Sequence, residues 1–159
     1  MSTALVGGSV WDRKFYDHLV DHIAAEEAIL GEYGKLAEDE SSSAAFRYLA
    51  SMILDDEVRH HQAFRDLAET VRISAELGRD EAPIPSLHGL RADRERVLEE
   101  TERMLAVEQA DLKDLKGLLK ELKDFRETTL WALKVEVMRL DTEKHIAILR
   151  FIRDRANEA

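Results

Sequence analysis

Glutamate and histidine stand three residues apart in the stretch Ile53-Leu-Asp-Asp-Glu57-Val-Arg-His60-His61, which lies inside a strongly helical segment. Residues three apart on a helix lie on the same face, so Glu57 and His60 can bind one metal ion together. A similar pattern, Asp141-Thr-Glu-Lys-His145, recurs near the end of the sequence, with Thr142 where a repeat would have Glu. These two stretches predict helices that carry metal ligands.

The surrounding sequence favours helix almost throughout. It is rich in Ala, Leu, Glu, Lys and Arg, and it contains only 7 Gly and 2 Pro in 159 residues. Apolar residues recur at spacings of three and four, which is typical of helices that pack along one face. We therefore expect an all-α single domain over residues 1–159, with helices over about 10–38, 41–77, 90–122 and 128–155.

Local signals mark the predicted helix ends. Ser9 can cap the first helix, the hydroxyls of residues 41–43 can cap the second, and Gly78 can end it. The segment 78–88 holds both prolines, and eleven extended residues can reach about 36–40 Å. One long link with short turns elsewhere predicts a four-helix bundle of two antiparallel hairpins joined by a crossover. The turn at 123–126 is marked only weakly.

Each predicted helix carries a polar ligand type on or beside its apolar stripe, near the middle of its length. The second helix offers Glu57 with His60, and the fourth offers His145, with Asp141 one position off the stripe. Glu27 is the nearest rival in the first helix, whereas Glu102 and Asp111 have the pattern of surface acids. The candidate metal ligands are Glu26, Glu57, His60, Glu108, Asp141 and His145.

Carboxylates on an apolar stripe need a partner, because a buried, unpaired charge is very costly. Two divalent cations would balance four carboxylates, with the two His as neutral nitrogen donors. We expect two iron ions, although the same ligands also accept manganese. Iron(II) held in this way can pass electrons to dioxygen or peroxide, which predicts an oxidoreductase.

The two halves of the chain share a weak repeat. Glu26 precedes His60 by 34 residues, and Glu108 precedes His145 by 37 residues. This spacing indicates a duplicated helical hairpin, each copy of which contributes one Glu and one His motif.

These motifs resemble the ferritin-like superfamily, specifically its small rubrerythrin-like members. Glu26 followed seven residues later by Tyr33 looks like their first helix, and the run 54–61 is similar to their Asp-Glu-x-x-His-His motif. Glu108 resembles their third-helix ligand, with Leu115 where Tyr is common. The resemblance implies a di-iron four-helix bundle with ferroxidase or peroxidase chemistry. Two departures are the absence of cysteine, which removes a rubredoxin module, and Thr142 in place of Glu.

Other interpretations stay open. The bundle can have lost its redox chemistry and serve a structural or interaction role, or it can be a metal-storage subunit of a larger shell. Glu57 and His60 can belong to a surface ion-pair cluster. Asp141 can reach the His145 metal at i,i+4, but its side chain is shorter than that of Glu. His18, His22 and Glu26 are spaced as in haemerythrins, yet the predicted third helix offers no His at all.

Bulk properties restrict the partners. A net charge of −10 argues against non-specific nucleic-acid binding, and no stretch approaches the ~18 apolar residues of a membrane span. The lack of cysteine fits a reducing cytoplasm, and we expect no signal peptide. Metal ions with dioxygen or peroxide are the expected partners, and long apolar helix faces indicate a homodimer or higher homo-oligomer. The substrate, electron donor and metal identity are not encoded in these patterns.

Overall fold

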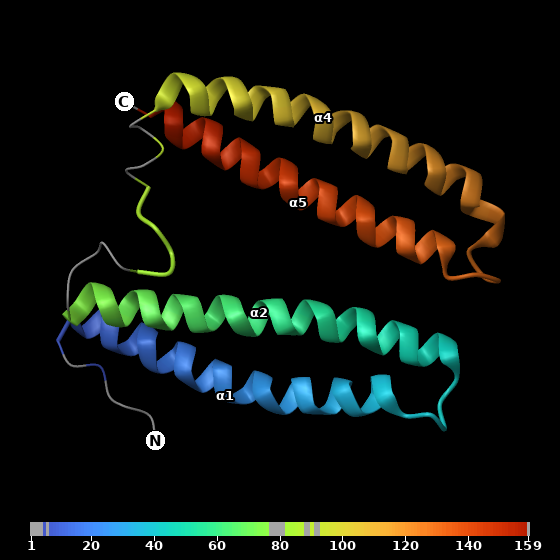
Figure 1. The fold of residues 1–159 in the computed structure, drawn as a ribbon, viewed down its shortest axis with the longest axis horizontal. Coiled ribbons are helices and arrows are strands. Elements are labelled where there is room, and N and C mark those ends of the chain that lie inside the picture. Colours follow the sequence, from blue (N-terminus) through green and yellow to red (C-terminus); the bar gives the residue numbers. More distant parts are fainter. Residues whose placement is uncertain (1–4, 6, 77–81, 88–89, 91–92, 159) are drawn as a thin grey trace. The chain divides into compact units, whose positions relative to one another are not determined.

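The computed structural model describes residues 5, 7–76, 82–87, 90 and 93–158. These residues form four long helices and no strand, so the predicted all-α class is confirmed (Figure 1). The helices are α1 (Val10–Glu38), α2 (Ala44–Glu76), α4 (Arg94–Glu121) and α5 (Trp131–Asn157), with the 3-10 helix η1 (Leu122–Phe125) after α4.

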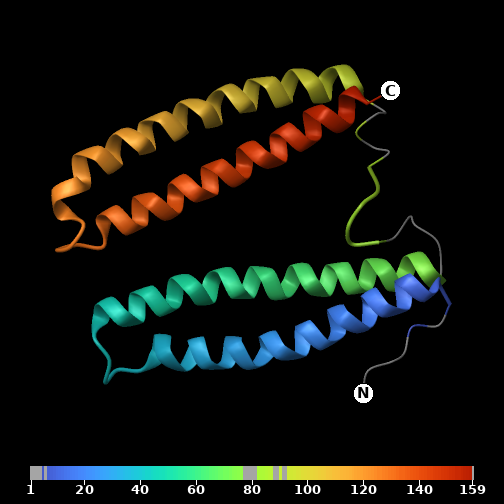
Figure 2. The same ribbon diagram turned by 180° about the vertical axis from the view of Figure 1, so that it is seen from behind.

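The chain divides into two compact units, Met1–Ser86 and Leu87–Ala159. In the first unit α1 packs beside α2, and in the second α4 packs beside α5, each pair forming a helical hairpin (Figures 1 and 2). None of the helices in the described part of the chain has an apolar stretch long enough to cross a membrane.

The start of α1 is fixed by a reciprocal cap. The Ser9 hydroxyl accepts a hydrogen bond from the Asp12 amide at 3.1 Å, and the Ser9 amide donates to the Asp12 carboxylate at 2.6 Å. The Ser9 amide thereby holds the pKa of Asp12 below its ordinary value. Gly8, with φ of 72°, leads into this cap, and a side chain there would meet Ala75 and Asp12 at 3.1 Å. The bounds of α1 match the prediction from sequence.

The turn between α1 and α2 is built around Asp39. Its carboxylate accepts hydrogen bonds from the Ser41 amide and hydroxyl at 2.9 and 2.6 Å and from the Ser42 hydroxyl at 2.9 Å. Only Ser43 caps the helix, since its hydroxyl accepts from the Phe46 amide at 3.2 Å. The second helix therefore begins at residue 44 and not at 41, because side chain to backbone bonds around Asp39 compete with helix formation. Its predicted end at 77–78 lies outside the described residues.

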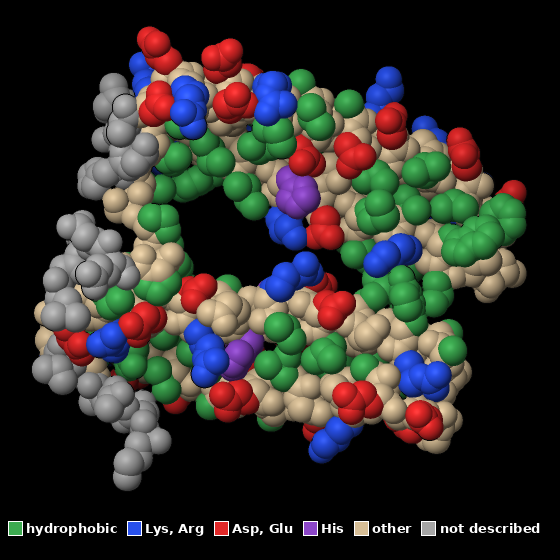
Figure 3. Space-filling model, viewed as in Figure 1, with side chains coloured by type: hydrophobic (Ala, Val, Ile, Leu, Met, Phe, Trp, Pro, Cys, Tyr) green, Lys and Arg blue, Asp and Glu red, His purple; other side chains and the backbone are tan. Residues whose placement is uncertain are grey.

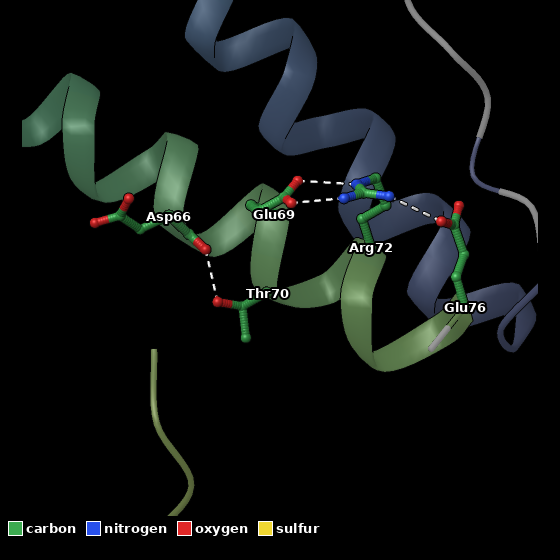
Figure 4. Close-up of polar contacts among 5 residues, drawn as sticks. All are labelled: Asp66, Glu69, Thr70, Arg72 and Glu76. Atoms are coloured by element: carbon green, nitrogen blue, oxygen red, sulfur yellow. Dashed lines mark hydrogen bonds and ion pairs between the residues drawn. The ribbon is translucent and has the colours of Figure 1, made fainter. Parts of the chain in front are cut away.

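Near its end, α2 carries an arginine between two glutamates. The Arg72 guanidinium donates to Glu69 at 2.6 and 2.8 Å and to Glu76 at 2.9 Å (Figure 4). These charge-assisted bonds hold the pKa of Glu69 below its ordinary value. In α5, Arg139 pairs with Glu136 and Glu143 at the same i−3 and i+4 spacings. Pairs at these spacings stabilise the exposed faces of both helices.

The proline-containing link follows α2. Residues 82–87, which include both prolines, are not helical, as predicted for this part of the segment 78–88; residues 78–81 and 88 lie outside the described part. The Thr70 hydroxyl donates to the Asp66 carbonyl at 2.7 Å (Figure 4). It also accepts a hydrogen bond from the Ile84 amide at 3.1 Å, which ties the link to α2.

The core of the first hairpin is centred on Leu19, which is 2% exposed. Burying such a side chain stabilises the hairpin by about 1.5–3 kcal/mol. The other buried members of this core are Leu5, Tyr16 and Ala68, and partly buried neighbours include Phe15, Ile23, Phe64, Leu67 and Val71.

The second hairpin is closed at both ends. At one end the amides of Thr128 and Thr129 donate to the Phe125 carbonyl, so α5 begins at residue 131 and not at 128. At the other end Arg94 donates to the Ala156 carbonyl at 3.0 Å and to the Asn157 side chain at 3.3 Å. α4 begins at residue 94, whereas the sequence predicted a helix from residue 90; residue 90 is itself helical, residue 93 lies in a turn, and residues 91–92 lie outside the described part.

The interior of this hairpin is apolar apart from two threonines. Its buried side chains are Thr101, Leu105, Leu115, Ala132, Thr142, Ile146 and Ala156. Large hydrophobic side chains also stay exposed, and several gather where α5 begins beside η1 (Figure 3). These include Phe125, Trp131 and Leu133.

Candidate metal centre

Glu26 lies in the middle of α1 and is the only buried carboxylate among the described residues, with 5% of its surface exposed. Two imidazoles lie near it, each closest to a different carboxylate oxygen. His22 Nε2, one turn earlier in α1, lies 3.3 Å from Glu26 Oε1. His61 Nδ1, from α2, lies 3.7 Å from Glu26 Oε2, and the His61 side chain is 12% exposed. The first hairpin thus places two nitrogen donors close to one carboxylate.

Two of these atoms have unmet bonding capacity. Glu26 Oε2 and His61 Nδ1 are both buried and have no hydrogen-bond partner within the described residues. An unsatisfied buried polar group costs about 1–3 kcal/mol. A bound cation would satisfy both atoms at once, because carboxylate oxygen and imidazole nitrogen are common ligands of transition metals.

The spacing of the donor atoms also fits a metal ion. Two ligands that each lie 2.0–2.2 Å from one tetrahedral ion are about 3.4 Å apart. The Glu26 to His22 and Glu26 to His61 separations of 3.3 and 3.7 Å lie on either side of this value. Carboxylate oxygen and imidazole nitrogen are donors that iron and manganese accept, and each separation allows one cation to contact Glu26 together with one imidazole.

Glu57 and His60 are close together on α2, as their sequence spacing predicts. His60 Nδ1 lies 3.9 Å from Glu57 Oε2, and the two side chains are 62% and 24% exposed respectively. Nearby, Arg59 forms an ion pair with Asp56. The α2 imidazole that contacts Glu26 belongs to His61, the residue that follows the predicted ligand His60.

The second hairpin contains one of the expected pairs. His145 Nδ1 on α5 lies 3.3 Å from Glu108 Oε2 on α4, and their side chains are 48% and 18% exposed. This contact joins the two helices near their middles. It is the same combination of one carboxylate and one imidazole that Glu26 and His61 form in the first hairpin.

Asp141 and Thr142 point to different partners. Asp141 Oδ1 lies 2.6 Å from the Lys144 ammonium, and its side chain is 44% exposed. Thr142 is buried, with 4% exposed, and its hydroxyl donates to Asp111 Oδ2 at 3.0 Å. Asp111, which has the sequence pattern of a surface acid, therefore contacts the position where the repeat lacks Glu.

Three polar residues of these contacts are not among the six predicted ligands: His61, Asp111, and His22, which the sequence offered only in the haemerythrin-like alternative. Each had a local signal. His22 stands at i−4 from Glu26, His61 directly follows His60, and Asp111 stands at i+3 from Glu108. The apolar stripe did not identify these positions as ligands. Adjacent residues on a helix are ~100° apart, so a residue beside the stripe can still reach the neighbouring helix.

The candidate ligands come together as pairs. No three His, Asp or Glu side chains in the described part of the chain are grouped as a complete metal-binding set. The pairs are Glu26 with His22, Glu26 with His61, Glu57 with His60, and Glu108 with His145.

Comparisons with models of protein families, with curated protein sequences and with solved structures find no match to this chain.

Proposed function

We propose that the protein is a ferritin-like, rubrerythrin-like metalloprotein that binds iron, with manganese as an alternative ion. The observation that supports it most is the buried Glu26 carboxylate, whose Oε2 faces the unpartnered Nδ1 of His61. His22 lies near Oε1, but Oε2 has no hydrogen-bond partner within the described residues, and burying a charged group with an unsatisfied atom is costly. A metal ion is the partner that satisfies both atoms.

One ion would be held in the first hairpin by Glu26 with an imidazole of α2, and Glu57 and His60, which are close together on α2, would be its further ligands. A second ion would be held by Glu108 and His145, with Asp141 as the carboxylate expected from the sequence. The second site has fewer contacts and more exposed donors, so it should bind more weakly. Bound iron(II) would supply electrons for the reduction of dioxygen or peroxide.

The protein's own residues have two tasks in this proposal. Glu26 supplies negative charge in a site from which burial excludes water, which strengthens its attraction for a cation. The core around Leu19 and Phe64 holds α1 against α2, and the His22 ring lies 4.1 Å from the Phe64 ring. These contacts fix the direction of the ligands before the ion arrives.

A matched pair of variants tests the site. Full-length protein treated with a chelator is titrated with manganese(II), and with iron(II) in the absence of oxygen, by calorimetry. Glu26→Gln should lower the affinity for the more tightly bound ion by at least about tenfold, because a charged ligand becomes neutral. Glu27→Gln is the control, since it removes the same charge from the exposed neighbour. Equal binding by both variants would show that Glu26 is not a ligand.

A second pair distinguishes the two imidazoles of α2. If His61 is the ligand, His61→Ala should lower the affinity for the more tightly bound ion, and His60→Ala should lower that affinity less. A larger loss of affinity in His60→Ala than in His61→Ala would identify His60 as the ligand, as the sequence predicts. Oxidation of iron(II), followed by absorbance with dioxygen or with peroxide, then tests the redox part of the proposal.

A structural role is the second candidate. It is favoured by the lack of a complete three-ligand group in the described residues and by Thr142 in place of Glu. Here Glu26 would be held by protonated His22 or His61, and such buried ion pairs can specify how helices pair. Wild-type protein that binds neither iron nor manganese in the titration would support this role.

A further inference from the structure

Two adjoining hollows lie at the end of the second hairpin, where α4 passes into η1 and α5 begins. One, of about 380 Å³, is lined by Leu119, Arg126, Ala132, Leu133 and Glu136. The other, of about 230 Å³, is lined by Leu119, Lys120, Lys123 and Arg126. Because Leu119 and Arg126 line both, the hollows form one concave surface with apolar walls and a few charged groups. Surfaces of this composition are typical of small-molecule sites.

The cations of these hollows are not neutralised by ion pairs. Lys120, Lys123 and Arg126 are exposed, and none of them forms an ion pair with another residue in the described part of the chain. Arg139, in contrast, pairs with both Glu136 and Glu143. Three positive charges therefore line one surface and can all contact an anion that enters it.

The nearby acids do not cancel these charges. Arg139 donates to the Glu136 carboxylate at 2.7 and 3.0 Å, and these hydrogen bonds, with a smaller contribution from the charge of Arg126, hold the pKa of Glu136 below its ordinary value. Glu136 is thus already satisfied by Arg139. The other acids of this stretch line neither hollow: they are Glu121, Asp124 and Glu127.

The net charge of the chain favours a small anion over a large one. At −10, the protein repels an extended anionic surface such as a membrane or a nucleic acid. A small anion in the hollow responds mainly to the nearest side chains, because physiological salt screens exposed charges beyond ~8 Å. Leu133 is 44% exposed, so an apolar group that covers it removes apolar surface from water. The surface therefore suits an anion that also has an apolar part.

We propose that the two hollows bind a small amphiphilic anion, an alkyl carboxylate of medium chain length. Its carboxylate lies among Lys120, Lys123 and Arg126, where the guanidinium can donate two parallel hydrogen bonds to it. Its alkyl chain lies against Leu119 and Leu133. This inference goes beyond the proposed metal binding, because none of the lining residues is a candidate metal ligand.

Titration of the full-length protein with decanoate, kept below the concentration at which it forms micelles, tests the assignment. Trp11→Phe leaves Trp131, which directly precedes Ala132, as the sole tryptophan and as a fluorescent reporter of the hollow. Decanoate should bind saturably, one molecule per chain, with the same affinity by fluorescence and by calorimetry. Decanol, which lacks the charge, and acetate, which lacks the chain, should each bind at least about tenfold more weakly.

Two charge-matched variants locate the carboxylate. The test variant combines Lys120→Gln, Lys123→Gln and Arg126→Gln. The control combines three changes at exposed lysines that line neither hollow, Lys14→Gln, Lys35→Gln and Lys113→Gln. Both lose three positive charges, but the test variant should lower the affinity for decanoate by at least about tenfold and the control by less than about twofold.

The apolar wall is tested separately. Leu133→Ala should lower the affinity for decanoate by about threefold or more, because it removes apolar contact area. Leu133 is exposed, so the far-ultraviolet circular dichroism should not change. An unchanged affinity for decanoate in Leu133→Ala would contradict the placement of the alkyl chain.

Other results would overturn the proposal as a whole. Equal affinities for decanoate and decanol would show that the cations take no part, and an equal loss in the two triple variants would show that only net charge matters. A dimer in sedimentation experiments that decanoate dissociates would identify a second copy of the chain as the occupant.

The outcome is independent of the metal centre. Glu26→Gln should bind decanoate as wild type does, and a loss of binding in this variant would place the anion near Glu26 and overturn the assignment. Protein that binds decanoate but neither iron nor manganese would support this inference and overturn the proposed function alone.

Discussion

Replacing Glu26 with leucine should make the metal-free protein more stable. In the absence of metal, the buried Oε2 of Glu26 has no hydrogen-bond partner in the described part of the chain, which costs about 1–3 kcal/mol. Leucine removes this cost. The variant loses the contact with His22, but that imidazole is 42% exposed and such i,i+4 pairs contribute only about 0.3–0.5 kcal/mol. The free energy of unfolding should therefore rise by about 1–2 kcal/mol.

Bound metal should reverse the order of stability of wild type and Glu26→Leu. A ligand present at about one hundred times its Kd stabilises the folded state by about 2.7 kcal/mol. Wild type would gain this stabilisation from its tighter ion, and Glu26→Leu would not. With saturating metal, wild type should thus become the more stable protein by roughly 1 kcal/mol.

Urea unfolding followed by circular dichroism measures both states, once with chelator and once with manganese(II). Glu27→Leu is the control, because Glu27 is exposed and surface substitutions usually change stability by less than about 0.5 kcal/mol. A loss of about 3 kcal/mol or more in metal-free Glu26→Leu would refute the reasoning, since it is the cost of breaking a buried ion pair. The carboxylate would then be a structural partner of a protonated histidine.

Three further predictions concern the fold. Leu19→Ala should lower the free energy of unfolding by about 3–5 kcal/mol in urea titrations, because Leu19 is 2% exposed and a cavity would remain. Asp12→Asn should destabilise α1 at neutral pH; since the cap lowers the folded pKa of Asp12 below 3.8, its contribution is lost as the pH falls through that folded pKa, and acid unfolding curves of variant and wild type should converge there. Thr142→Glu should destabilise the metal-free protein by placing a carboxylate beside Asp111, and manganese(II) should recover part of the loss in thermal unfolding.

Local sequence signals predicted the helices well where they acted alone. The Ser9 cap fixed the start of α1, and the bounds 10–38 were correct. At the next turn, any of three serines could have capped α2 on sequence grounds. The Ser41 and Ser42 hydroxyls donate to Asp39 instead, and α2 begins at residue 44 rather than 41. Which of several similar groups wins such a competition depends on three-dimensional geometry that the pattern does not contain.

The candidate site was predictable to the level of helix faces. Spacing identified Glu26 as a carboxylate on an apolar stripe, and it is buried. Spacing selected His60 and not His61, whereas the His60 side chain is 62% exposed and the His61 side chain is 12% exposed and contacts Glu26. That choice depends on the rotation of α2 against α1, which spacing does not contain. The contact of Asp111 with Thr142 was equally hidden, since it joins residues 31 positions apart.

The guanidinium of Arg94 has a consequence for the motions of the second hairpin. The last carbonyls of a helix normally lack partners, and the final turn opens easily. Here Arg94 covers the Ala156 carbonyl and the Asn157 side chain from the first turn of α4. The amide protons at the end of α5 should therefore exchange with deuterium more slowly than those of an uncovered helix end, and Arg94→Gln should accelerate their exchange while leaving the rates in α2 unchanged.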